Sequence, residues 1–195
     1  FEWLRDYAMR IDLTEQPDID CLLAPSGPIK EAQENASRVF KCDRTFFLTN
    51  GSTSGVQAML LTNSGPGKKI IMPRDAHMSA FSGLVMSGAQ PVFVYPDVDP
   101  KWGVTRGVPF AEYEKALDAH DDICACYITR PNYYGMCPEI KQVVKLCHEK
   151  GIPVLVDEAH GAHIGFHSEM PDSALESGAD YVVQSAHKTL QAYTG

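Results

Sequence analysis

The chain has 195 residues, 44% of them hydrophobic and 22% charged, which is enough apolar material for one sizeable buried core of the ordinary globular kind. Its formal net charge is −8 and it has no basic patch, so nucleic acid and anionic membrane surfaces, which would repel it, are not expected partners. No apolar run reaches the roughly 18 residues that cross a bilayer, and six cysteines in no dense spacing favour reduced thiols, so we expect a soluble, cytoplasmic protein.

Two segments are expected along the chain. Residues 1–43 predict an irregular entry segment followed by a helix over residues 29–40, and residues 44–195 predict a larger domain. The sequence starts at Phe1 rather than at methionine and ends close to a helix-like stretch. We therefore expect a fragment, with the larger domain truncated at its C-terminal side.

Short apolar runs alternate with amphipathic stretches from about residue 44 onward, a pattern typical of parallel βαβ units. Strands are expected over residues 68–73, 90–96, 122–129, 152–158 and 179–186. Helices are expected over residues 52–63, 76–87, 109–120 and 138–150, the last with a proline in its first turn. The predicted fold class is α/β, a mostly parallel sheet with helices on both faces.

Open parallel sheets bind ligands at the carboxyl ends of their strands, so the polar residues at those positions are the functional candidates. The first is the stretch NGSTS at residues 50–54, between a strand-like FFLT and a helix, where Gly51 lets the backbone come close to a ligand. Free amide groups at a helix start favour a phosphate, and Ser52 and Thr53 would add hydroxyl donors. A hydroxyl-rich helix start without a ligand is the alternative.

His77 lies at the next strand-to-helix junction, in PRDAHMSAF. An imidazole there can lie flat on an aromatic ring, or it can cap the helix without touching a ligand. Further along, Cys124 and Cys126 alternate within DICACYIT, where a regular strand would point both to the same face. We interpret these two cysteines as packing residues rather than metal ligands.

Asp157 ends the run IPVLVDE, which reads as a strand buried on both faces. A carboxylate there is costly unless it is paired, and a pyridinium nitrogen is a partner that it would keep protonated. The alternative is an aspartate that caps the next helix. His160, His163 and His167 follow, but their spacing does not match a zinc motif, and no metal is expected.

Lys188 follows the last expected strand in SAHKTL, beside Ser185 and His187. A lysine in a crevice can lose its proton through desolvation and form an imine with a carbonyl compound, although a surface lysine that opens a helix is the alternative. Asp157 and Lys188 are 31 positions apart (188 − 157), which leaves room for one crossover and one strand, so two neighbouring strands could present both groups to one ring.

The sequence around Asp157 and Lys188 resembles the major domain of the ornithine, lysine and arginine decarboxylases. The resemblance is carried by VLVDEAHGAHIGFH, followed by SALESGADYVVQSAHKTL. These decarboxylases are fold type I pyridoxal-phosphate enzymes of the aspartate aminotransferase superfamily. Other landmarks of the resemblance are DLTEQPDID, IKEAQENASRVFKCDRTFFLTNGSTSG, DAHMSAFSGLVMSGAQPVFVYP and TRPNYYGMCPEIKQVV. The last lacks the asparagine-proline order of typical aminotransferases, which favours the decarboxylase branch and leaves the partner of the ring hydroxyl unnamed.

The resemblance implies pyridoxal 5′-phosphate as the cofactor and assigns roles to these positions. Lys188 would form the Schiff base, Asp157 would pair with the pyridine nitrogen, and His77 and Ala159 would cover the two faces of the ring. Ser52 and Thr53 in the first loop, with Gly51, and Ser185 and His187 beside the lysine would hold the phosphate. His160 would lie near the cofactor edge or the substrate carboxylate.

The resemblance also implies the activity, which is decarboxylation of arginine, lysine or ornithine to a polyamine or its precursor. The full-length protein would form a homodimer or a higher homo-oligomer, with the residues that read the substrate side chain outside this chain. The alternatives are an aminotransferase or lyase with the same cofactor, or a non-catalytic fragment of such an enzyme.

Overall fold

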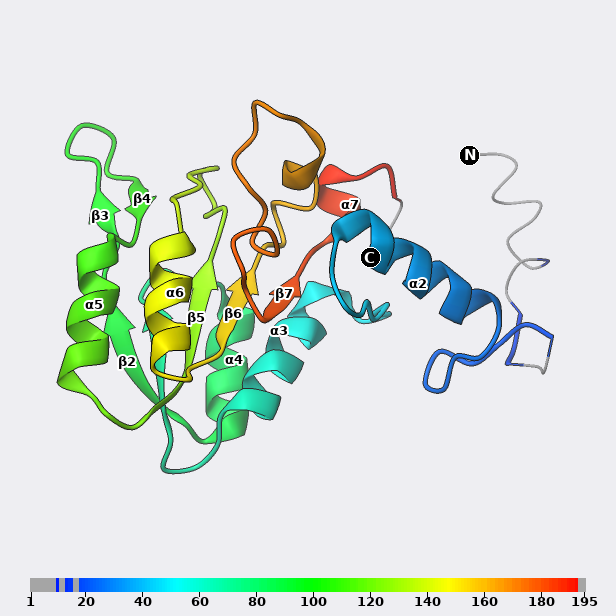
Figure 1. Cartoon of the computed structure of the whole chain (residues 1–195), viewed down its shortest axis with the longest axis horizontal. Coiled ribbons are helices and arrows are strands. Elements are labelled where there is room, and N and C mark those ends of the chain that lie inside the picture. Colours follow the sequence, from blue (N-terminus) through cyan, green and yellow to red (C-terminus); the bar gives the residue numbers. More distant parts are fainter. Residues whose placement is uncertain (1–9, 11–12, 16–17, 193–195) are drawn as a thin grey trace. The chain divides into compact units, whose positions relative to one another are not determined.

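The structure is a computed structural model that describes residues 10, 13–15 and 18–192 (Figure 1). Parts of the expected entry segment and the last three residues of the chain therefore lie outside the described residues. The chain divides into two compact units, residues 1–47 and residues 48–195. Over the described residues, no helix has both the length and the apolar character that a membrane span requires.

The first unit contains α2 (Pro28–Phe40), which matches the helix expected over residues 29–40. The carboxylate of Asp20 accepts backbone N–H groups at the start of this helix, among them those of Gly27 and Ile29 at 2.8 and 2.9 Å. Backbone N–H donors, foremost that of Ser26 and then those of Cys21, Gly27 and Lys30, hold the pKa of Asp20 well below its usual range, although burial opposes the shift. Asp20 thus stabilises the uncapped end of α2.

The second unit contains a five-stranded parallel sheet with the order β2-β1-β5-β6-β7. Its strands are β1 (Lys69–Pro73), β2 (Gln90–Val94), β5 (Ile123–Thr129), β6 (Val154–Asp157) and β7 (Tyr181–Val183). Every strand expected from 68 onward is therefore present, in a sheet whose strands all run the same way. The predicted α/β class is confirmed.

Helices cover both faces of this sheet (Figure 1). One face carries α5 (Phe110–Ala119) and α6 (Lys141–Glu149), and the other carries α3 (Gly51–Asn63) and α4 (Met78–Ser87). Alternate strand residues feed the two core layers, as the pleat of a strand requires. Under α5 and α6 lie Ile71, Cys126, Ile128, Val154 and Val156. Under α3 and α4 lie Ile70, Met72, Ala125, Tyr127 and Leu155.

The expectation that Cys124 and Cys126 share one face is wrong. The register between β1 and β5 shifts after Lys69, which pairs with Ile123, so that the next residue of β1 pairs with Ala125. The extra residue opposite this step is Cys124, as in a β-bulge. Cys126 therefore lies in the layer under α5 and α6, while Cys124 packs against the other layer.

Three further details differ from the sequence-based expectation. Residues 46–49, the strand-like FFLT, lie in no strand. The helix expected from residue 138 begins at Lys141, since the carbonyl of Pro138 accepts the Nε–H of Arg130 at 2.7 Å and holds this segment in the preceding loop. A two-stranded hairpin, β3 (Asp97–Val98) and β4 (Thr105–Gly107), was not expected.

Candidate active site

Asp157 is the last residue of β6 and lies between two neighbouring strands, where it pairs in register with Thr129 of β5 and Val183 of β7. Only 5% of its surface is exposed. Its Oδ1 accepts the backbone N–H of Ala159 at 3.0 Å, and its Oδ2 accepts the hydroxyl of Tyr127 at 3.2 Å. Each carboxylate oxygen therefore has one protein donor, which offsets part of the cost of burying the charge.

Lys188 lies in α7 (Ala186–Thr189), the short helix that follows β7. Its side chain is exposed, and its Nζ lies 3.1 Å from Nε2 of His160, which follows β6. Burial and the positive charge of Lys188 lower the pKa of His160, and the negative charge of Asp157 opposes the shift. A neutral imidazole can accept a hydrogen bond from the lysine ammonium, so Nε2 is the acceptor in this pair.

His77 is the N-cap residue of α4. Its Nδ1 accepts the backbone N–H of Ser79 at 3.2 Å and lies 2.9 Å from the hydroxyl of the same serine. His77 therefore caps α4, which was the alternative interpretation of this residue, and the contact with Ser79 fixes the orientation of its ring. The stacking role stays a prediction; His77 also lowers the pKa of His160, so the two imidazoles lie within electrostatic reach of each other.

The start of α3 has the features expected of an anion site. Gly51 has a positive φ of 69°, and an added Cβ would meet nothing within 4 Å. Asn50 makes no side-chain cap, and the first turn carries no acidic residue. Backbone N–H groups at the start of this 13-residue helix are thus not used by a cap. Ser52 is half-buried and Thr53 is exposed on the same turn.

Ser185 and His187 both precede Lys188 and differ in their exposure. Ser185 is fully buried and is the N-cap residue of α7, and its carbonyl accepts the backbone N–H of Lys188 at 3.3 Å. His187 is exposed. Both residues follow the carboxyl end of β7. Because β6 and β7 are parallel, this end lies at the same edge of the sheet as Asp157, the last residue of β6.

A buried ion pair next to Asp157 was not anticipated from the sequence. Arg130 and Glu158 are 1% and 0% exposed, with Nη1 and Oε1 3.6 Å apart. Glu158 also accepts the N–H of Ala174 at 2.8 Å and the amide of Gln184 at 2.7 Å. The available signal was the pair of charged residues directly after two buried strands, where a buried charge demands a partner.

Asn132 uses its whole side chain within the loop after β5. Its Nδ2 donates to the carbonyl and the hydroxyl of Thr105, at 2.8 and 3.2 Å. Its Oδ1 accepts the N–H groups of Tyr134 and Met136, both at 3.0 Å. Two donors and two acceptor positions are the full capacity of an amide, so Asn132 shapes the loop and has no hydrogen bond left for a ligand.

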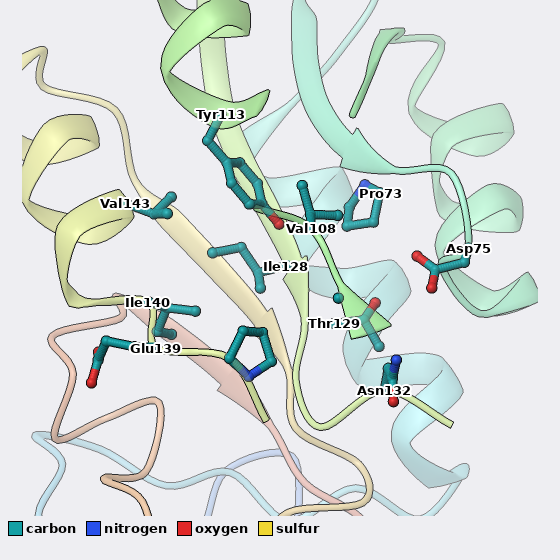
Figure 2. A pocket seen from close by; sticks show the side chains of 12 residues that line it. Pro73, Asp75, Val108, Tyr113, Ile128, Thr129, Asn132, Glu139, Ile140 and Val143 are labelled. Carbon is teal, nitrogen blue, oxygen red and sulfur yellow. The ribbon is translucent and has the colours of Figure 1, made fainter. Parts of the chain in front are cut away.

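A small pocket lies on the α5 and α6 side of the sheet (Figure 2). Tyr113 and Val143 reach it from the two helices, and Thr129 and Asn132 line it from the end of β5 and the following loop. Its interior of about 10 Å³ has room for about one water molecule. Neither Asp157 nor Lys188 lines it, so this pocket is separate from the candidate site.

The parallel sheet with helices on both faces is a fold that solved structures share. Lysine decarboxylase A from Pseudomonas aeruginosa superposes with a TM-score of 0.78 at 23% identity, over 86% of this chain and 24% of that one. Alanine aminotransferase from Pyrococcus furiosus gives 0.66 at 14% identity, over 95% of this chain and 47% of that one. These likenesses confirm the expected aspartate aminotransferase-like fold.

The sequence match is more specific than the fold. Residues 1–195 match the family described as Orn/Lys/Arg decarboxylase, major domain, and the chain belongs to this family. An arginine decarboxylase of Halalkalibacterium halodurans is 45% identical over 186 residues, which is 95% of this chain and 38% of that protein. The chain thus spans about two fifths of the length of this curated relative.

Proposed function

We propose that this chain is the cofactor-binding part of a pyridoxal-phosphate-dependent decarboxylase of a basic amino acid, with arginine as the first candidate substrate. The observation that carries the proposal is the group formed by Lys188, His160 and Asp157 at the ends of β6 and β7. Arginine ranks first because the relative at 45% identity is an arginine decarboxylase, whereas the lysine decarboxylase above is 23% identical.

The residues present fit the cofactor. Asp157 is a buried carboxylate with two protein donors, suited to hold the proton of a pyridine nitrogen. The uncapped start of α3, with Gly51, Ser52 and Thr53, offers amide and hydroxyl donors to a phosphate dianion. Ser185 and His187 would complete the phosphate contacts, and His77 and Ala159 would cover the two faces of the ring. Lys188 would hold the cofactor covalently.

In the proposed reaction the bond between the α-carbon and the carboxylate breaks, carbon dioxide leaves, and a proton takes its place on the α-carbon. Bound pyridoxal phosphate supplies the electron sink for the electron pair that remains. Asp157 would keep the pyridine nitrogen protonated, and His160, whose Nε2 lies 3.1 Å from Nζ of Lys188, would orient the lysine side chain. The ring of Tyr133 meets that of His160 edge-on, with the ring centroids 6.4 Å apart.

The full-length protein would act in the cytoplasm in polyamine formation, as a homodimer or a higher homo-oligomer. The amino-acid substrate would meet its specificity-determining residues outside this chain. The composition and the sequence match support these proposals.

The decisive experiment is a product assay of the full-length protein with arginine, lysine and ornithine, scored by the amine and by carbon dioxide. We expect both products from arginine, and we expect Lys188→Ala to lower the rate at least about 10³-fold and to abolish the cofactor's visible absorbance. Keto acid in place of amine would support the aminotransferase alternative. Neither product, despite bound cofactor, would support a non-catalytic protein.

A further inference from the structure

The hydroxyl of Tyr127 is directed at Asp157 from the neighbouring strand. Tyr127 lies in the middle of β5, is 0% exposed, and packs in the core layer under α3 and α4. Its hydroxyl donates to Oδ2 of Asp157 at 3.2 Å, whereas Oδ1 of Asp157 is held by the backbone of Ala159. One side-chain donor and one backbone donor therefore fix the plane of a carboxylate that ends its own strand.

We propose that Tyr127 is a positioning residue that orients the carboxylate of Asp157 toward the cofactor ring; this inference rests on the proposed function. Of the two donors to Asp157, the N–H of Ala159 belongs to the backbone, so Tyr127 supplies the one that a single side-chain substitution can remove. A buried hydrogen bond to a charged acceptor changes a binding equilibrium by about 10- to 100-fold.

Tyr127 is suited to donate a hydrogen bond to Asp157. Burial raises its pKa well above the usual value, and the negative charge of Asp157 raises it further. The phenol therefore keeps its proton at physiological pH, and its hydrogen bond always runs toward the carboxylate. Asp157 also acts electrostatically on His160, which contacts Lys188, so the orientation of the carboxylate is coupled to the rest of the site.

The chain offers a matched control for the loss of one buried phenol hydroxyl. Tyr113 of α5 is 3% exposed and packs in the other core layer, under α5 and α6. It lines the small pocket of Figure 2, to which Asp157 and Lys188 do not contribute. Tyr127→Phe and Tyr113→Phe remove the same atom from similarly buried positions, on opposite faces of the sheet.

The experiment measures the dissociation constant of pyridoxal phosphate and the induced circular dichroism of the bound cofactor in the full-length protein. We expect Tyr127→Phe to weaken cofactor binding about 10- to 100-fold and to alter the circular dichroism band, which reports the orientation of the ring. We expect Tyr113→Phe to change neither. Thermal unfolding without cofactor establishes that both variants fold.

A double-mutant cycle with Asp157→Asn decides whether Tyr127 acts through Asp157. We expect Tyr127→Phe to have little further effect on cofactor binding once the carboxylate charge is gone, so the two changes should be far from additive. Additive effects, or equal effects of the two phenylalanine variants, would overturn the inference. If the unsubstituted protein binds no pyridoxal phosphate, the proposed function itself fails, and that outcome is distinguishable from both.

Discussion

Two carboxylates that are adjacent in sequence lie in different surroundings: Asp157 ends β6, and Glu158 directly follows it. Glu158 is 0% exposed and its partners all belong to the protein, namely the N–H of Ala174, the amide of Gln184 and the guanidinium of Arg130. Burial raises the pKa of Glu158, and these partners oppose the shift without cancelling it.

Asp157 has fewer protein partners than its neighbour, with one donor on each oxygen. A carboxylate oxygen can accept about two hydrogen bonds, so Asp157 retains capacity for a ligand. It also ends its strand close to His160 and Lys188, whereas Glu158 is tied to Arg130 in the protein interior. Each carboxylate accepts one hydrogen bond on each oxygen, so burial and the number of donors do not separate the two; the buried guanidinium of Arg130, 3.6 Å from Glu158, does.

The largest effect on function is expected when the charge of Asp157 is removed. We expect Asp157→Asn to lower the rate of product formation about 10²- to 10³-fold, because the stabilisation of the reacting ring is lost. The unfolding temperature should change little, since an amide occupies the same volume. Steady-state rates of the full-length protein, with folding checked by thermal unfolding, measure both quantities. A variant with normal turnover would remove Asp157 from the site.

Removing the charge of Glu158 should lower the stability of the fold and leave cofactor binding nearly unchanged, the opposite of the result expected for Asp157. Glu158→Gln leaves the buried guanidinium of Arg130 without a counter-charge, and breaking a buried pair in this way costs about 3–5 kcal/mol. We expect a large fall in the free energy of unfolding, measured by denaturant titration, with cofactor affinity per folded molecule nearly unchanged. Unchanged stability together with lost cofactor binding would reverse the roles assigned to the two carboxylates.

A smaller loss of stability is expected for Gly161→Ala, which tests how tightly the residues around Glu158 are packed. A Cβ at Gly161 would lie 2.5 Å from Cγ of Glu158 and 2.8 Å from Cδ of Pro131. Such overpacking typically costs about 1–3 kcal/mol. We expect this loss in thermal unfolding, and we expect no loss at Gly165→Ala, where the nearest atom lies at 3.6 Å. Equal stability of the two variants would contradict the described packing.

The smallest expected effect is on the titration of His160. Its pKa is lowered, mainly by burial and then by the charge of Lys188. Because the folded form resists protonation, His160 contributes stability above its ordinary pKa that is lost as the pH falls through the depressed value. We expect Lys188→Met to raise the pKa of His160 in an NMR titration.

The matched control for this titration is Lys145→Met, on the exposed side of α6. It removes the same charge at a position that does not contact His160, and we expect no change in the titration curve. Identical curves for the two lysine variants would show that Lys188 does not act on His160 in solution.

Much of the fold was predictable because it depends on local periodicity. The five strands of the main sheet and the helices between them follow from short apolar runs and amphipathic stretches, and the candidate residues at the strand ends follow from the rule for parallel sheets. The late start of α6 was not predictable from Pro138, because a side chain from another segment, Arg130, captures the carbonyl that would otherwise enter the helix.

By itself, the sequence determined the α/β class, the family resemblance and the positions of Asp157, His77 and Lys188 at strand ends. Only the tertiary structure decided which side chains meet across strands. The hydroxyl of Tyr127 reaches Asp157, Arg130 reaches Glu158, and a bulge sends Cys124 and Cys126 to opposite faces. The physical reason is strand register, a long-range property that pairs residues far apart in the chain and that local patterns do not encode.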